Sequence, residues 1–253
     1  MAGYSQQKSA KAISRWLFLT MLLVIAVIVV GGATRLTNSG LSITEWKPIT
    51  GIFPPLTHAQ WVAEFEKYKQ IPEFMAEHPD MDLKGFEFIY FMEWSHRQLG
   101  RIIGLAYLLP LILFLAMGRI EKGRRARFIL VFVLICIQGG IGWWMVKSGL
   151  VNDRVDVHPV RLSVHLGLAF IILGMLFWTF MDQVQRWPAK QMMPLLRAPT
   201  TFLAFLVFLQ IIAGAFVAGT HAGLSYNTWP LMDGGLVPRG YLILQPWWRN
   251  MLE

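Results

Sequence analysis

Five uncharged, strongly apolar segments constrain this chain more than any other feature of its sequence. They cover residues 16–34, 102–117 (the tail of a longer segment), 128–146, 162–181 and 198–220. A helix needs about 20 residues to cross the hydrocarbon core of a bilayer, and these segments are of that length. With 55% hydrophobic and only 15% charged residues, the chain is poorer in charge than a soluble domain. We therefore expect an all-α integral membrane protein.

The first apolar segment reads as a membrane span rather than a cleaved signal. Its apolar run is too long for the core of a signal peptide, and GGATRLTNSG, which follows it, is a poor cleavage site. The short tail before it lacks the Arg- and Ser-rich composition of an organelle transit peptide. These features favour a multi-pass protein of the bacterial cytoplasmic (inner) membrane.

Basic residues in the short connections predict the orientation. Three Lys or Arg residues lie in 1–15, five in 119–127 and three in 182–199, and such clusters mark cytoplasmic loops. The N-terminus is then cytoplasmic, and residues 35–87, 147–161 and everything after 220 are outside. The loop 35–87 has eight acidic against five basic residues, as suits an external loop. The net charge of +8 is mostly a topology signal, and we expect no nucleic-acid partner.

The chain contains an internal repeat. TNSGLSITEW (37–46) follows the first span and THAGLSYNTW (220–229) follows the fifth, at an offset of 183 residues. Repeats of several helices are a common way to build a membrane protein. We expect a cytoplasmic tail (1–15), a four-helix bundle unit (16–182), a cytoplasmic linker (183–199) and the start of a second, repeated unit (200–253). That second unit would hold only its first helix, so we expect a C-terminally truncated fragment or a partner that supplies the missing helices.

Two histidines at membrane depth are the leading candidates for a cofactor or substrate site. On helices entering from outside near Phe88 and Pro159, His96 lies about 12 Å and His165 about 9 Å along the axis, at about 1.5 Å per residue. Neutral imidazole is a good iron ligand, and two at matched depth suit the axial positions of one haem. The competing interpretation is a pair of hydrogen-bonded packing histidines.

The remaining histidines and the single cysteine are weaker candidates. His58, His78 and His158 fall in loops or at the membrane edge and are expected to be solvated, and His221 is expected to serve local turn chemistry. Cys136 is alone in an apolar segment, so no disulfide within the chain can form.

Ionisable residues surround His96 on the second membrane segment. Glu93 precedes it by three residues and so shares its helical face, while Arg97 and Arg101 form a neighbouring stripe. Guanidinium groups suit the capture of carboxylates, which haem propionates provide, although interfacial snorkelling with a Glu93–Arg97 pair explains them too. Gly100 and Gly104, four residues apart, are expected to mark close helix packing.

Several longer motifs resemble one family. GGATRLTNSGLSITEWKPITGIFPP, EWSHRQLGRIIGL, RLSVHLGLA and AGLSYNTWPLMDG are similar to the haem A synthase family, in the form shared by proteobacteria and mitochondria, and the resemblance runs from about Trp16 to the last residue. It implies an oxidoreductase that converts haem O to haem A for terminal oxidases. The C8 methyl group of haem O would become a formyl group through successive hydroxylations.

The resemblance also implies roles for individual residues. His96 and His165 match the histidine pair of the N-terminal half, which would ligate the iron of the haem O or haem A being processed. Glu93 matches the acidic residue of an E-x-x-H motif needed for activity, and Arg97 and Arg101 join the haem environment. A haem b is expected in the C-terminal half, of which we expect this chain to lack the sixth to eighth helices and their two histidines. The cysteine pair that some relatives carry in the first external loop is absent.

Two other functions fit the same residues. One is a bis-histidine membrane cytochrome that only transfers electrons, and the other is a non-catalytic haem carrier or assembly factor. The expected partners are the lipid bilayer, the farnesyltransferase that makes haem O, and cytochrome oxidase assembly, while the oligomeric state (a homo-oligomer included) stays open. The electron-transfer cytochrome does not explain an acidic residue on the ligand face, and the haem carrier would need the histidines without turnover.

Overall fold

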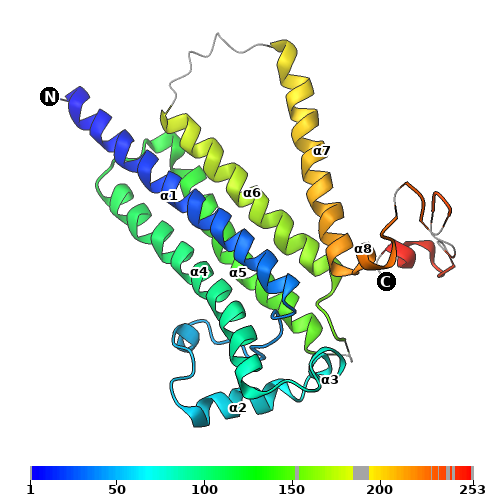
Figure 1. Ribbon diagram of the computed structural model, residues 1–253. Helices are drawn as coiled ribbons and strands as arrows, with labels where there is room; N and C mark the ends of the chain where they lie inside the picture. The colour runs from blue at the N-terminus through cyan, green and yellow to red at the C-terminus, as the bar shows by residue number, and fades with distance from the viewer. Residues whose placement is uncertain are drawn as a thin grey trace.

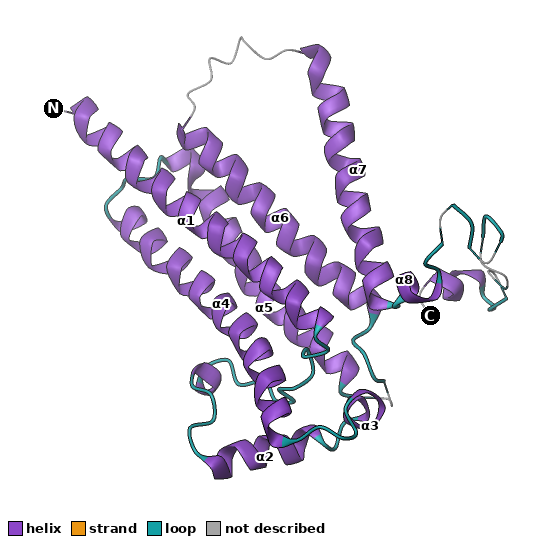
Figure 2. Cartoon of the chain, viewed as in Figure 1, coloured by secondary structure: helices purple, strands orange, loops and turns teal. Residues whose placement is uncertain are grey.

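The computed structural model describes residues 2–151, 154–184, 194–228, 230–232, 234–237, 240 and 243–251. Within these ranges the chain is helical, with one isolated bridge between Met232 and Gly235 and no β-strand (Figure 2). Five helices are long and apolar enough to cross a membrane. The prediction of an all-α protein with five spanning helices is confirmed. Most of the expected linker, residues 185–193, and Trp229 of the second repeat lie outside the described residues.

The five long helices exceed the segments predicted from hydropathy. They are α1 (Ala2–Leu36), α4 (Leu83–Ala116), α5 (Arg125–Gly149), α6 (Pro159–Val184) and α7 (Pro194–Gly219). Residues 2–15, expected as a tail, belong to α1. The 34 residues of α4 span about 50 Å at about 1.5 Å each, well beyond the roughly 30 Å hydrocarbon core.

Local signals explain both ends of α4. The side chain of Asp82 accepts a hydrogen bond from the backbone N–H of Gly85 at 2.8 Å, which caps the first turn. At the other end Gly118 takes the left-handed conformation (φ 64°), and the N–H of Arg119 returns to the carbonyl of Phe114 at 2.9 Å. The short η2 (Lys122–Arg124) then leads into α5.

Helices α1, α4, α5 and α6 pack in a ring, with α1 against α4 and α6, and α5 against the same two helices (Figure 1). The half of this ring that lies away from α2 and α3, which we call the inner bundle, has an apolar core around Trp16. Its indole lies 4.8 Å from the ring centroid of Tyr107 and 5.9 Å from that of Phe128. The indole N–H donates to the carbonyl of Ala106 at 2.9 Å, so this buried polar group is satisfied.

The segment between α1 and α4 folds into an outer layer instead of a plain loop. It contains η1 (Thr50–Ile52), α2 (His58–Tyr68) and α3 (Pro72–Glu77), and it has its own aromatic core. In that core Phe65 stacks on Phe86 of α4 with centroids 4.9 Å apart. His58 is exposed, as expected, but the expectation of a solvated His78 is wrong. Its Nδ1 lies 2.9 Å from the hydroxyl of Tyr68, and the side chain is half-buried.

Among the long helices α7 packs mainly on α6, and it diverges from α6 toward the N-terminal end of α7 (Figure 1). Contact is close near its C-terminal end, where a Cβ on Gly219 would lie 3.0 Å from Pro159, and one on Gly167 would lie 2.8 Å from Ile212. The short α8 (Ala222–Ser225) follows, and η3 (Trp247–Met251) ends the described chain. Most described side chains of α7 are exposed.

Candidate haem-binding site

The structure brings the two predicted ligands together. The imidazole centroids of His96 on α4 and His165 on α6 lie 6.5 Å apart, with an angle of 46° between the ring planes. His96 lies 20 residues before the end of α4 at Ala116, and His165 lies 19 residues before the end of α6 at Val184. Because both helices run in the same direction, the two rings stand at the same depth.

The separation of the rings can be tested against haem ligation. An iron bound linearly by one nitrogen of each ring, at about 2 Å per bond as in other metal–imidazole sites, would hold the centroids roughly 6 to 6.5 Å apart. The observed 6.5 Å agrees with this. Both side chains are half-buried, and among the described residues no group of three or more His, Cys, Asp or Glu could hold a free metal ion. The pair fits a metal that arrives inside a larger ligand.

Glycines on α1 and α5 make room for the two rings. A Cβ on Gly31 would lie 2.7 Å from Cε1 of His96, and one on Gly142 would lie 3.0 Å from Cε1 of His165. Real Cβ contacts are almost never as short as 2.7 Å, so a side chain at Gly31 would displace the imidazole. All four helices of the ring therefore meet at the histidine pair, two with imidazoles and two with glycines.

A residue that sequence reasoning missed lies against His165. The side-chain amide nitrogen of Gln138 on α5 donates to the backbone carbonyl of His165 at 2.9 Å and lies 3.2 Å from its Nδ1. The Oε1 of Gln138 is buried and has no partner among the described residues. The available signal was that Gln138 is the only amide side chain in the apolar segment 128–146. Within the described chain the ring of His96 makes no hydrogen bond.

Glu93 is buried (3% exposed), and both of its carboxylate oxygens are engaged. One accepts from the hydroxyl of Ser42 at 2.8 Å and from the backbone N–H of Ile43 at 2.7 Å. The other accepts from Nε and Nη2 of Arg97 at 3.0 and 2.5 Å, a bidentate ion pair. The pairing with Arg97 was foreseen as the alternative role of Glu93. Its bonds to the GLSI segment after α1 were not foreseen.

Arg97 and Arg101 hold the backbone of the same segment. Arg97 also donates to the carbonyls of Ile43 and Glu45 at 2.8 and 3.0 Å. Arg101 donates to the carbonyls of Lys47 and Pro48, both at 2.9 Å. Its remaining terminal nitrogen lies 2.6 Å from Oε1 of Gln98. Gln98 also donates to the carbonyl of Ile52 at 3.0 Å. One face of α4 thus fastens residues 42–52, which we call the strap.

The expected close packing at Gly100 and Gly104 is wrong. A Cβ at either position would meet no atom within 4 Å apart from the helix's own neighbouring backbone. Both glycines follow His96 at intervals of four residues on the same face of α4, so the α4 surface below this imidazole is open. Their spacing alone could not separate close packing from open space.

A third polar cluster joins the two repeated segments. Nη1 of Arg35 lies 3.1 Å from Oδ1 of Asp156, and its Nη2 donates to the carbonyl of Ala218 at 3.1 Å and lies 2.6 Å from Nε2 of His221. The same His221 nitrogen lies 2.8 Å from Oδ2 of Asp156. Asn38 and His221, equivalent in the repeat, both have left-handed backbones, with φ of 46° and 52°. The expected turn role of His221 agrees with this conformation, but its ion pair was not foreseen.

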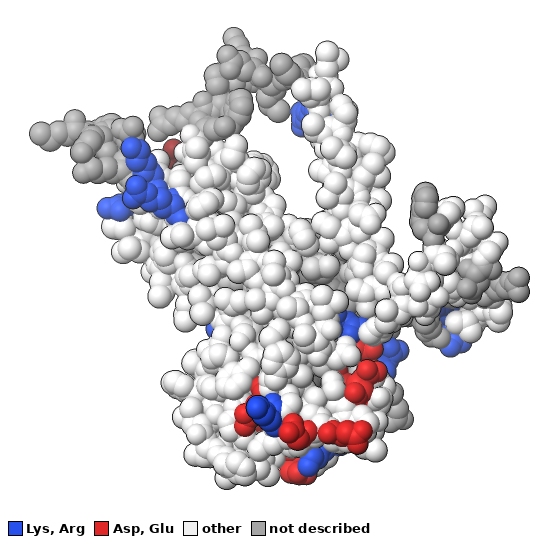
Figure 3. Space-filling model, in the orientation of Figure 1, with Lys and Arg blue, Asp and Glu red and all other residues white. Residues whose placement is uncertain are grey.

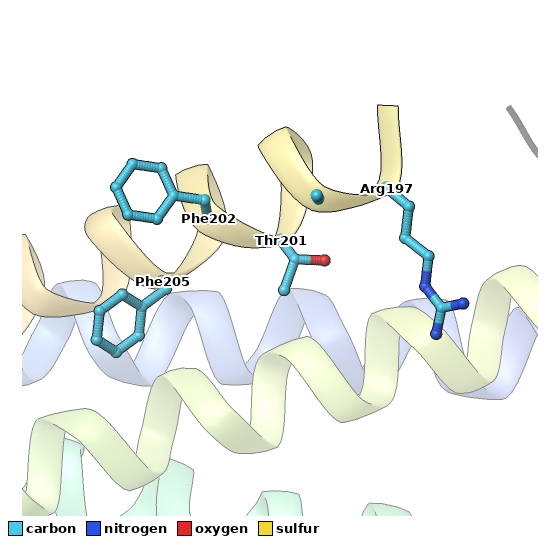
Figure 4. A pocket seen from close by; sticks show the side chains of 5 residues that line it. Arg197, Thr201, Phe202 and Phe205 are labelled. Atoms are coloured by element: carbon cyan, nitrogen blue, oxygen red, sulfur yellow. The ribbon is translucent and has the colours of Figure 1, made fainter. Parts of the chain in front are cut away.

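Two open hollows lie away from the histidine pair. One, of about 660 Å³, is lined by Arg197, Ala198, Thr201, Phe202 and Phe205 of α7 (Figure 4). The other, of about 470 Å³, runs along residues 77–82 and Gly85 of the outer layer. Neither contains a histidine of the pair, and we assign neither to the site.

Comparison with known proteins found relatives that are similar to this chain over nearly its whole length. Haem A synthases of Parvibaculum lavamentivorans and Maricaulis maris are each 50% identical to it, over 96% and 94% of this chain and 70% of each relative. That of Rhodopseudomonas palustris is 46% identical over 100% of the chain and 70% of its own length. No solved structure matches significantly. The model of one family, described as cytochrome oxidase assembly protein (COX15-CtaA), matches residues 14–253, and the chain belongs to this family.

Proposed function

We propose that this protein is a haem A synthase of the inner membrane, which oxidises the C8 methyl group of haem O to the formyl group of haem A. The observation that carries the proposal is the pair of imidazoles on α4 and α6, 6.5 Å apart at one depth. The names of the relatives and the oxidase-assembly family support the same reaction. Haem O is the substrate here, and its iron positions the ring.

The proposed division of labour follows from the contacts. His96 and His165 would ligate the iron, while Gly31 and Gly142 leave room for their rings. Gln138 would orient His165, because its amide holds both the backbone and the ring of that residue. The strap, fastened by Glu93, Arg97 and Arg101, would shield the reacting edge of the substrate from water.

Glu93 has two proposed roles that one experiment separates. As a catalytic residue it would take up or release protons while the methyl group passes through alcohol to aldehyde. As a positioning residue it would only fasten the strap, and its four hydrogen bonds support this second role. Glu93→Gln keeps the shape but cannot titrate. A catalytic Glu93 predicts bound haem with product lost or stopped at the hydroxylated intermediate, whereas normal haem A yield would exclude that role.

We also propose the wider architecture expected from the repeat. The shared left-handed turns at Asn38 and His221 support two related units. The Lys and Arg side chains near the N-terminal end of α1, opposite the acidic residues over α2 and α3, support a cytoplasmic N-terminus (Figure 3). A second unit would hold a haem b, and the enzyme that farnesylates haem would supply the substrate.

The product distinguishes this function from its rivals. The native gene product, expressed in a membrane that contains haem O, should convert it to haem A, as chromatography of extracted haems would detect. A bis-histidine cytochrome or a haem carrier would bind haem without making a formylated product. Bound haem O with no haem A or hydroxylated intermediate would reject the synthase.

A further inference from the structure

Arg97 and Arg101 were the expected partners of the haem carboxylates, but their nitrogens are already committed. Every guanidinium nitrogen of Arg97 donates to Glu93 or to a strap carbonyl. Each nitrogen of Arg101 likewise has an oxygen partner at 2.6 to 2.9 Å. Recruiting either residue would release the strap, and a buried carboxylate would lose its ion partner. A carboxylate entering this site needs other cations.

Arg35 lies one helical turn outward from the histidine pair. It follows Gly31, the residue in contact with the His96 ring, by four positions on α1, so it stands on the same face about 6 Å further out. Its side chain is 19% exposed, and its Nε is buried without a partner in the described chain. A buried donor without an acceptor is costly, and binding a ligand oxygen would remove that cost.

Arg161 occupies the matching place on α6. It precedes His165 by four residues, so it stands one turn outward on the face that carries the second imidazole. Its Nη1 donates to the carbonyl of Trp144 at 2.7 Å, and its guanidinium lies 4.6 Å from the Trp144 ring centroid. Within the described residues its other two nitrogens make no hydrogen bond. The stacked guanidinium is oriented while keeping donors to spare.

We infer that Arg35 and Arg161, rather than Arg97 and Arg101, bind the propionate carboxylates of the haem substrate, an inference that rests on the function proposed above. The two arginines flank the histidine pair from α1 and α6, each one turn toward the outer surface. A guanidinium group presents paired donors that match a carboxylate. The haem would then be held by its iron at the imidazoles and by its acidic edge at the two arginines.

Asp156 gives this inference an unusual consequence. Its carboxylate forms an ion pair with Arg35 at 3.1 Å, so in the substrate-free protein it takes the place of a ligand carboxylate. His221 contacts both residues and can retain Asp156 when Arg35 turns to the ligand. Asp156→Asn removes the competing charge and should therefore tighten the binding of an acidic haem. If the Arg35–Asp156 ion pair were purely structural, Asp156→Asn would leave haem binding weaker or unchanged.

The test compares haem b with its dimethyl ester, which lacks both carboxylates, by absorbance titration of the native protein in detergent. The binding signal is the part of the wild-type absorbance change that is lost in His96→Ala. Arg35→Gln and Arg161→Gln should each weaken haem b binding by about tenfold, as expected for one charge-assisted contact, and leave the ester unchanged. Asp156→Asn should tighten haem b binding alone.

Matched variants keep the outcomes separate. Arg154→Gln removes an exposed arginine from the loop that carries Asp156 and should change neither titration. Arg35→Lys keeps a cation for Asp156 but lacks the paired N–H donors of a guanidinium group. This variant should therefore fold, yet lose the difference in affinity between haem b and its dimethyl ester. Equal discrimination in wild type and in both Gln variants would overturn this inference. A signal that survives His96→Ala would instead reject the proposed haem site.

Discussion

The inner bundle and the strap of the outer layer are held in place by different forces. In the inner bundle the helices α1, α4 and α5 meet through apolar and aromatic side chains around Trp16. In the outer layer one face of α4 fastens the irregular strap through buried charges and backbone carbonyls. The histidine pair lies between the two. Apolar packing therefore sets the spacing of the helices that carry the imidazoles, whereas hydrogen bonds hold the strap to one face of α4.

The largest expected effect comes from breaking the inner bundle. Trp16→Ala removes the ring that contacts Tyr107, Phe114 and Phe128, and large-to-small changes of this kind cost about 3 to 5 kcal/mol. Thermal unfolding in detergent should show a large loss of stability that does not depend on salt. An equally stable variant would mean that the inner core does not hold the bundle.

Breaking the outer layer should cost nearly as much by another route. Glu93→Ala leaves the Arg97 guanidinium without its buried partner, a change worth about 3 to 5 kcal/mol. We expect the strap to become accessible to protease around residues 42–52 while the helices remain folded. A strap protected as well as in the wild type would contradict this account.

A smaller effect is expected where the two regions meet. Gly31→Ala places a methyl group 2.7 Å from His96, and overpacking of this kind costs about 1 to 3 kcal/mol. Because a ring can move more easily than a helix, the main result should be a changed haem spectrum. Gly100→Ala is the matched control, since its Cβ meets open space. Identical spectra for both variants would show that Gly31 does not position the ring.

The last prediction concerns pH and the outer layer alone. Burial, first of all, raises the pKa of Glu73 to about 8, opposed by the hydrogen bond from Tyr68. The folded protein therefore holds a proton that the unfolded chain releases from about pH 4.5, and stability should fall between pH 4.5 and 8 by about 1.4 kcal/mol per unit at most. Glu73→Gln should remove this slope. An unchanged pH profile of unfolding would contradict the buried, protonated carboxyl.

Much of this arrangement could be predicted from sequence, for identifiable reasons. Run length and missing charge locate helices, and the helical rise places His96 and His165 at one depth without any knowledge of packing. The strap could not be foreseen, because the bonds from Arg97 and Arg101 go to backbone carbonyls, which any sequence provides. The role of Gly31 could not be predicted either, because the identity of a glycine does not show which residue of another helix packs against it. The Arg35–Asp156–His221 contacts join residues up to 186 positions apart.

The central claim is that the two imidazoles between the inner bundle and the outer layer ligate one haem. The most direct test is the absorbance and electron paramagnetic resonance spectrum of the native protein, recorded for the wild type, His96→Ala and His165→Ala. We predict a low-spin, six-coordinate haem in the wild type and the loss of that signal in each single variant, with the helical content unchanged. An unchanged spectrum in both variants would contradict the claim.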